Sequence, residues 1–151
     1  MLMTRGVLAV SLALASGLPL AQKADATALT VTIEGLRNGQ GEVSLGLYAS
    51  DANWPSGRPM AHVELPAAAG TLTYTFSDLK PGHYALSGYH DENANGLFDT
   101  NFLGLPKEGF VFSRDYRPRF HPPHFDDCVI ALTDTAAAIT VHLQYWSTVD
   151  P

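Results

Sequence analysis

Several stretches of the chain alternate apolar and polar residues with a period of two, and this pattern constrains the fold more than any other feature. Residues 29–34, 43–48 and 72–76 each place an apolar side chain at every second position. A period of two puts successive side chains on opposite faces, which predicts half-buried β-strands. No stretch after residue 26 shows the 3.6-residue period of an amphipathic helix. We therefore expect an all-β chain.

Further strands are expected between turn-forming residues. They lie at 62–65, 84–90, 128–132 and 139–145, with a shorter one near 110–112. Asn38-Gly39 and Gly41, between the first two strands, predict a β-hairpin because both residue types tolerate positive φ. About seven short strands with frequent turns are typical of a β-sandwich. We expect a single such domain over residues 27–151.

The N-terminal segment, residues 1–26, has the composition of a secretory signal peptide. Met1–Arg5 carries one positive side chain, and the apolar run 6–20 follows it. Ala24-Asp25-Ala26 then provides small residues for a cleavage site. A membrane anchor fits less well, because the run is about fifteen residues long and a spanning helix needs about twenty. We expect an exported protein, periplasmic or secreted, without stable membrane insertion.

The chain is acidic, and it has one cysteine. Its net charge is −6, from 9 basic and 15 acidic residues, and it becomes −7 (7 minus 14) without residues 1–26. Such a chain repels nucleic-acid phosphate, whereas it attracts divalent cations. Cys128 is the only cysteine, which excludes an internal disulfide. Its apolar neighbours 129–132 place it in the core.

The strongest candidate site is the segment 90–99, His-Asp-Glu-Asn-Ala-Asn-Gly-Leu-Phe-Asp. Oxygen-bearing side chains recur there at odd spacing, and Gly96 allows the backbone to fold around an ion. The side chains that could bind a cation are those of Asp91, Asn93, Asn95 and Asp99. The first six positions from Asp91 match the start of an EF-hand calcium loop. In such a loop the ligand at the seventh position is a main-chain carbonyl, here that of Leu97.

The segment also departs from an EF-hand. Its twelfth position is Phe102 instead of a bidentate glutamate, and no helical pattern flanks it. Glu108 could reach back and supply a carboxylate. The alternative is an Asx-rich turn, whose side chains only accept hydrogen bonds from backbone N–H groups. We predict a Ca²⁺ site, in preference to Mg²⁺, on a scaffold that is not an EF-hand.

Residues 100–127 form a long segment without a sustained period, rich in proline and aromatic residues. The aromatic residues are Phe102, Phe110, Phe112, Tyr116, Phe120 and Phe125. Long ordered loops tend to be functional, so we expect this one to present a surface to an unidentified protein or small ligand. Arg114, Arg117 and Arg119 predict either an anion or carbohydrate contact or a solvated face paired with nearby aspartates.

A metal-assisted hydrolase is the alternative function, using the same loop or the region of His121 and His124. Imidazole and carboxylate groups suit Zn²⁺ or Cu²⁺, but the two prolines between these histidines fix an extended backbone. Ser113 lacks the surroundings of an activated nucleophile. We assign no catalytic residue, and we expect His90 to hydrogen-bond the backbone of the loop that follows it.

Four motifs follow one another along the chain. They are Leu79–Ala85, His90–Asp99, Leu103–Phe110 and Pro123–Cys128. In this order they resemble DUF2141, a family of exported bacterial proteins of unknown function, over about residues 29–145. The resemblance implies one β-sandwich, Ig-like or similar to transthyretin-like and carboxypeptidase-regulatory-like modules, with no established activity. Transthyretin-like hydroxyisourate hydrolases end in Tyr-Arg-Gly-Ser, which this chain lacks, so that activity is not implied.

Overall fold

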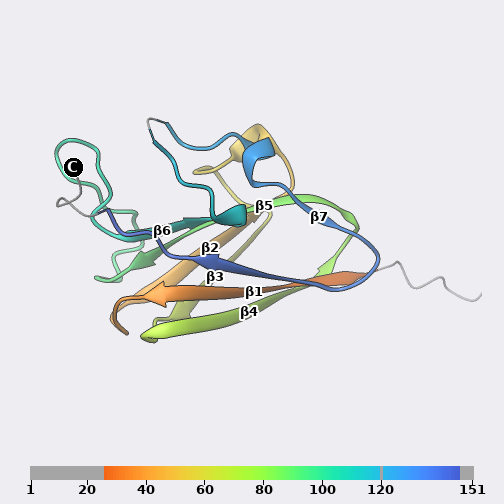
Figure 1. Cartoon of the computed structure of the whole chain (residues 1–151), viewed down its shortest axis with the longest axis horizontal. Helices are drawn as coiled ribbons and strands as arrows, with labels where there is room; N and C mark the ends of the chain where they lie inside the picture. The colour runs from red at the N-terminus through yellow and green to blue at the C-terminus, as the bar shows by residue number, and fades with distance from the viewer. Residues whose placement is uncertain (1–25, 120, 147–151) are drawn as a thin grey trace, which may run out of the picture.

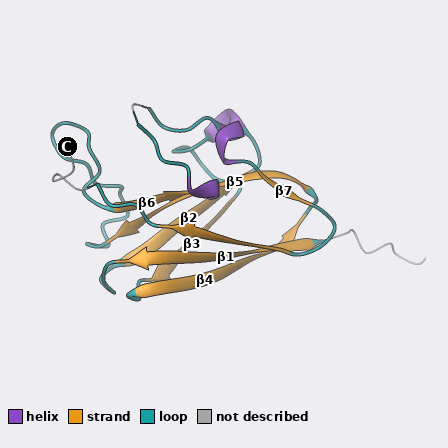
Figure 2. Cartoon of the chain, viewed as in Figure 1, coloured by secondary structure: helices purple, strands orange, loops and turns teal. Residues whose placement is uncertain are grey.

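The computed structural model describes residues 26–119 and 121–146. The predicted signal peptide, residues 1–26, therefore lies outside the described residues except for its last position, and so does Phe120. Within the described part the chain is all-β, as expected, with eight strands and three short 3₁₀ helices (Figure 2). None of the described helices is long and apolar enough to cross a membrane.

The elements follow in the order of the chain. The strands are β1 Thr27–Leu36, β2 Glu42–Tyr48, β3 Ala61–Pro66, β4 Gly70–Leu79, β5 Gly82–Asp91, β6 Gly109–Phe112, β7 Ile130–Leu132 and β8 Ala137–His142. The 3₁₀ helices are η1 Asp51–Asn53, η2 Ser113–Asp115 and η3 Phe125–Cys128. The expected strand at 128–132 thus begins at Ile130, because Cys128 closes η3.

Two sheets form the β-sandwich (Figure 1). The smaller has the order β4-β1-β8, with β1 antiparallel to β4 and parallel to β8. The larger has the order β3-β2-β5-β6, and β7 pairs with the start of β5. Alternate residues of both sheets form one apolar core, including Leu29, Val31, Ile33, Val43, Leu45, Leu47, Leu86, Val111 and Val141. The predicted sandwich is confirmed.

The connection 37–41 does not form the predicted hairpin. β1 pairs with β4 and β8, whereas β2 pairs with β3 and β5, so this connection crosses from one sheet to the other. Alternation shows which face of a strand is buried, but it does not show which strand lies beside it. The turn does need its glycine: Gly41 has a φ of +67°, and a Cβ there would lie 1.9 Å from the carbonyl oxygen of Asp91.

The end of the described chain connects the two sheets. β8 pairs with β1 as far as His142, and the Leu143 N–H then donates to the Glu34 carbonyl at 2.9 Å. Gln144 exchanges two backbone hydrogen bonds with Phe110 of β6, at 2.9 and 2.8 Å. The expected strand at 139–145 is therefore shared between both sheets, and it brings Tyr145 to the end of β5.

Candidate functional site

The segment 91–99 forms a loop that closes on the carboxylate of Asp91. Asp91 is the last residue of β5, and it is 3% exposed. One carboxylate oxygen accepts the N–H of Asn95 at 3.2 Å, and the other accepts the N–H of Gly96 at 2.7 Å. Gly96 has a φ of +74°, a conformation that glycine adopts at little cost. The first predicted ligand therefore lies at the centre of the loop.

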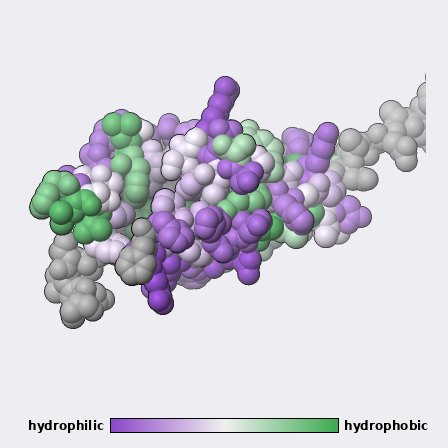
Figure 3. All heavy atoms as spheres, turned by 90° about the horizontal axis from the view of Figure 1, so that it is seen from above, coloured by the Kyte–Doolittle hydropathy of each residue, from purple (hydrophilic) through white to green (hydrophobic). Residues whose placement is uncertain are grey.

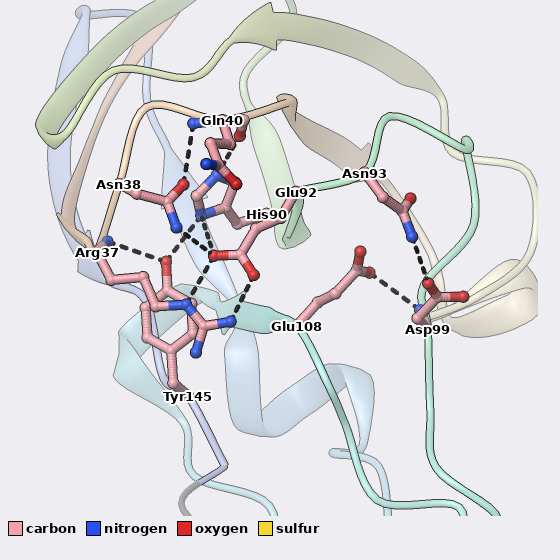
Figure 4. A network of polar contacts seen from close by, with 9 residues as sticks. All are labelled: Arg37, Asn38, Gln40, His90, Glu92, Asn93, Asp99, Glu108 and Tyr145. Carbon is pink, nitrogen blue, oxygen red and sulfur yellow. Dashed lines mark hydrogen bonds and ion pairs between the residues drawn. The ribbon is translucent and has the colours of Figure 1, made fainter.

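Two of the other predicted ligands, Asn93 and Asn95, meet at a third, Asp99. Its Oδ2 accepts a hydrogen bond from the side-chain amide of Asn93 at 2.8 Å (Figure 4). The side-chain amide of Asn95 donates to the same oxygen at 3.2 Å. The Oδ1 atoms of these asparagines accept the N–H groups of Asn95 and Leu97, at 3.1 and 2.8 Å. Leu97 itself is 65% exposed. The ligand side chains of the loop therefore lie together, in hydrogen bonds that an Asx-rich turn would also make.

Glu108 joins this group from the residue before β6. Its side chain is buried, at 4% exposure, and Oε2 accepts the N–H of Asp99 at 3.0 Å (Figure 4). The Lys107 N–H donates to the Asp99 carbonyl at 3.0 Å, which folds residues 100–106 back. Burial raises the pKa of Glu108 above its ordinary value, and the negative charges of Asp91 and Asp99 raise it further, against the hydrogen bond from Asp99.

No positive side chain of the described residues pairs with these three carboxylates. The described ion pairs are Arg37–Glu92, His90–Glu92, His142–Glu34 and His142–Asp115. The described residues also hold no ready-made cluster of three or more His, Cys, Asp or Glu side chains at metal-binding spacing. A metal at Asp91, Asp99 and Glu108 would need amide and backbone oxygens as well, and an oxygen-only set of this kind fits Ca²⁺.

His90 belongs to a different network, so our expectation that it bonds the backbone of the 91–99 loop is wrong. It is fully buried, with Nδ1 bonded to the Tyr145 hydroxyl and Nε2 to the Gln40 carbonyl, both at 2.8 Å (Figure 4). The reason is the alternation of β5, which turns His90 and Asp91 to opposite faces. His90 thereby fixes the 37–41 connection and the end of the described chain.

Glu92 has a structural role that the sequence did not reveal. It forms an ion pair with Arg37, whose Nε lies 2.6 Å from Oε1, and it accepts the Asn38 amide at 2.7 Å. The hydrogen bond from Arg37 lowers the pKa of Glu92, although burial opposes it. The Arg37 guanidinium also lies 4.4 Å from the centre of the Tyr145 ring. The sequence did hold one indication of this separate role, because Glu92 lies between the predicted ligands Asp91 and Asn93 and is not one of them.

The candidates for hydrolysis have structural partners. The rings of His121 and His124 lie 5.5 Å apart, but His121 Nδ1 bonds the Pro122 carbonyl at 2.7 Å. The buried Ser113 hydroxyl donates to the Cys128 carbonyl at 2.6 Å and accepts the N–H of Leu86. Burial raises the pKa of the Cys128 thiol to about 12, which keeps it protonated as expected of a core residue.

The 100–127 segment and the loop after β2 cover the outer face of the larger sheet. Trp54 contacts Phe112 and Phe125, with ring centres 5.8 and 6.1 Å apart, and its indole N–H donates to the Pro123 carbonyl at 2.9 Å. Large apolar side chains remain exposed at the loop tips, namely Leu97, Phe98, Phe102 and Leu103. Apolar surface gathers at this end of the molecule (Figure 3). Sequence reasoning identified the aromatic composition but not the cavity that these loops enclose.

The fold and the site define a two-sheet β-sandwich with an oxygen-rich loop at the end of a central strand. The chain belongs to DUF2141, described as an uncharacterized protein family conserved in bacteria, whose family model matches residues 31–140. The match spans the sandwich from β1 into β8, and it includes the whole 91–99 loop and the 100–127 segment. No curated protein and no solved structure matches the chain.

Proposed function

We propose that the protein is an exported binding module in which Ca²⁺ binds at the Asp91–Asp99 loop and fixes the 100–127 segment against the sandwich. The observation that carries this proposal is that the negative charges of Asp91 and Asp99 act on the buried Glu108 carboxylate, while none of the three has a positive partner among the described residues. Ionised carboxylates taken from water without a counter-charge are costly. A hard divalent cation with oxygen ligands removes that cost.

The ion would act by linking three parts of the chain. Asp91 ends β5, Asp99 lies at the far side of the loop, and Glu108 leads into β6. Residues 100–107 form the closed loop between the last two of these ligands. A cation held by all three would therefore stabilise the loop and the start of the aromatic segment together, and its role would be structural. The export part of the proposal is supported by the sequence of residues 1–26 alone.

The test is thermal unfolding of the purified protein after EDTA treatment, followed by separate titrations with Ca²⁺, Mg²⁺ and Zn²⁺. A ligand that binds only the folded state stabilises it by about 2.7 kcal/mol at a hundredfold excess over Kd. For a domain of this size, that corresponds to a rise in Tm of roughly 10 °C. We expect this rise with Ca²⁺ and a much smaller one with Mg²⁺.

Two variants with the same change of charge show where the ion binds. Asp99→Asn removes a predicted ligand, and it should abolish most of the response to Ca²⁺. Asp134→Asn changes an exposed aspartate in the β7–β8 turn, and it should leave the response intact. An unchanged Tm in Ca²⁺, or an equal response in both variants, would contradict the proposal. A response to Zn²⁺ alone would move attention to His121 and His124 and to the hydrolase alternative.

A further inference from the structure

A cavity of about 590 Å³ lies on the outer face of the larger sheet, between that face and the loops that cover it. This volume is within the range of small-molecule sites. β2 shows why the face is covered. Its inward residues lie in the core, and the outward Ser44 and Tyr48 are also buried, at 6% and 5% exposure, outside the core cluster. A second layer therefore lies over this side of the sheet.

The floor of the cavity consists of small side chains on β2 and β5. Gly46 lies opposite Ser87 in the strand register, Ser44 lies opposite Tyr89, and Gly88 follows Ser87; all of these line the cavity. The hydroxyl of Ser44 bonds His62 Nε2 at 2.9 Å, and that of Ser87 donates to the Pro55 carbonyl at 3.0 Å. The short side chains of Ser44 and Ser87 leave space in the cavity that larger residues would fill. At Gly46 a Cβ would already lie 3.1 Å from the Tyr48 ring, and at Gly88 it would lie 2.6 Å from Leu45 of the core.

One wall is a series of aromatic rings. Tyr89, Phe98, Phe110 and Phe112 follow one another with ring centres 5.5, 6.2 and 6.0 Å apart. Phe98 remains 41% exposed. Trp146, at another part of the lining, remains 43% exposed. Aromatic rings prefer tilted and edge-to-face contacts at these distances. A flat aromatic molecule would extend the series and cover the exposed rings.

The charge of the lining is opposite in sign to that of the whole protein. The chain has 15 acidic and 9 basic residues, yet none of the described residues that line the cavity is acidic. The lining contains one fully charged side chain, Arg119, together with His62 and His121. Such a lining favours a single negative group on an otherwise apolar occupant, because guanidinium pairs well with carboxylate.

We propose that this cavity binds a small planar aromatic compound with one anionic group, its ring against the Phe98–Phe110 wall and its carboxylate at Arg119. This proposal rests on the binding role proposed above, but it does not require the cation. Phe98 belongs to the 91–99 loop, so Ca²⁺ would act on the wall of the cavity and not on the recognition of the anion.

The experiment is calorimetric titration of the whole purified protein with 2-naphthoate, neutral 2-naphthalenemethanol and aliphatic dodecanoate. We expect one site that prefers naphthoate to both. Arg119→Ala should weaken naphthoate binding roughly threefold to fivefold, because Arg119 is exposed, and it should leave naphthalenemethanol unchanged. Arg117→Ala removes an exposed arginine outside the lining and serves as the matched control.

Two further variants test the position of the site. Phe98→Ala should weaken naphthoate binding by roughly a factor of three to ten through the loss of a ring contact. Ser44→Phe should abolish binding by filling the floor; Phe98→Ala, at a half-exposed position, keeps the test valid where the buried variant does not fold.

Several results would overturn the proposal: no binding of naphthoate, equal binding of the alcohol, tighter binding of dodecanoate, or no effect of Phe98→Ala. Titration in EDTA and in Ca²⁺ separates the two proposals. Naphthoate binding without any effect of Ca²⁺ on Tm would refute the cation and retain the cavity, and the reverse pattern would refute the cavity.

Discussion

Replacement of Glu108 by glutamine tests the charge balance of the site directly. The amide keeps an oxygen that can accept the N–H of Asp99, but it removes a negative charge that is 4% exposed and close to Asp91. Because the pKa of Glu108 is raised in the folded state, the stability tied to its protonated form is present below the ordinary glutamate pKa. That stability is lost as the pH rises through the raised pKa. At pH 7 the ionised side chain therefore costs stability.

Glu108→Gln is expected to change stability in opposite directions without a cation and with Ca²⁺. Without a cation, Glu108→Gln should be more stable than the unaltered protein by about 1 kcal/mol, the scale of relieving one poorly compensated buried polar group. In Ca²⁺ the variant loses a charged ligand. A tenfold weaker Kd would then remove about 1.4 kcal/mol of the Ca²⁺-dependent stabilisation. The stability advantage of Glu108→Gln over the unaltered protein in EDTA should therefore shrink or reverse in Ca²⁺.

The assay is thermal unfolding at pH 7, followed by circular dichroism, in EDTA and in millimolar Ca²⁺. Differences of about 1 kcal/mol correspond to roughly 3–5 °C in a domain of this size. Glu64→Gln, at an exposed position on β3, controls for the change in net charge. A variant that is less stable in EDTA would show that Glu108 acts only as a hydrogen-bond acceptor. An unchanged gain in Ca²⁺ would show that it is not a ligand.

Two other predictions concern the structure beside the loop. Gly109→Ala should lower the free energy of unfolding by about 1–3 kcal/mol in urea titration, because its Cβ would lie 2.4 Å from the Tyr145 ring. Gly82→Ala, whose Cβ would meet no atom closer than 3.7 Å, should change it far less, and equal losses would contradict the steric reason. Glu92→Gln should destabilise by about 0.5–1 kcal/mol at pH 7 after allowance for the exposed Arg37. This difference should vanish as the pH falls through the lowered pKa of Glu92, since its stabilisation is present above the ordinary glutamate pKa, and a pH-independent difference would refute the ion pair.

The strands were predictable from the sequence because the fold buries one face of most of them. β1 alternates buried and half-exposed positions along most of its length, and the period of two follows from that environment. The pairing was not predictable in the same way. Gly41 and its neighbours have the chemistry of a hairpin turn, but they carry the chain between sheets, and only the long-range contacts of β1 with β4 and β8 decide this.

The same distinction between local pattern and long-range contact applies to the candidate site. The spacing of Asp91, Asn93, Asn95 and Asp99 was visible because all four lie in one short loop. Glu108 could be suggested as a ligand from the sequence. Its position, however, depends on how residues 100–107 fold back, and this is fixed by the hydrogen bond between Lys107 and Asp99. The cavity was out of reach, since its floor, wall and charge come from separate strands and loops that share no local pattern.

The contacts at the end of β5 hold Asp91 in place, so a cation would not be needed to position this residue. His90 and Glu92 anchor this strand to the 37–41 connection and to Tyr145, while Gly41 packs against the Asp91 carbonyl. These contacts place Asp91 without any ion. Asp99 and Glu108, in contrast, are positioned by hydrogen bonds within the loops themselves. The proposed Ca²⁺ would therefore bind to a strand end that is already fixed and would order the distal loops. Phe98 lies in those loops, so the proposed cation would also affect the shape of the cavity wall.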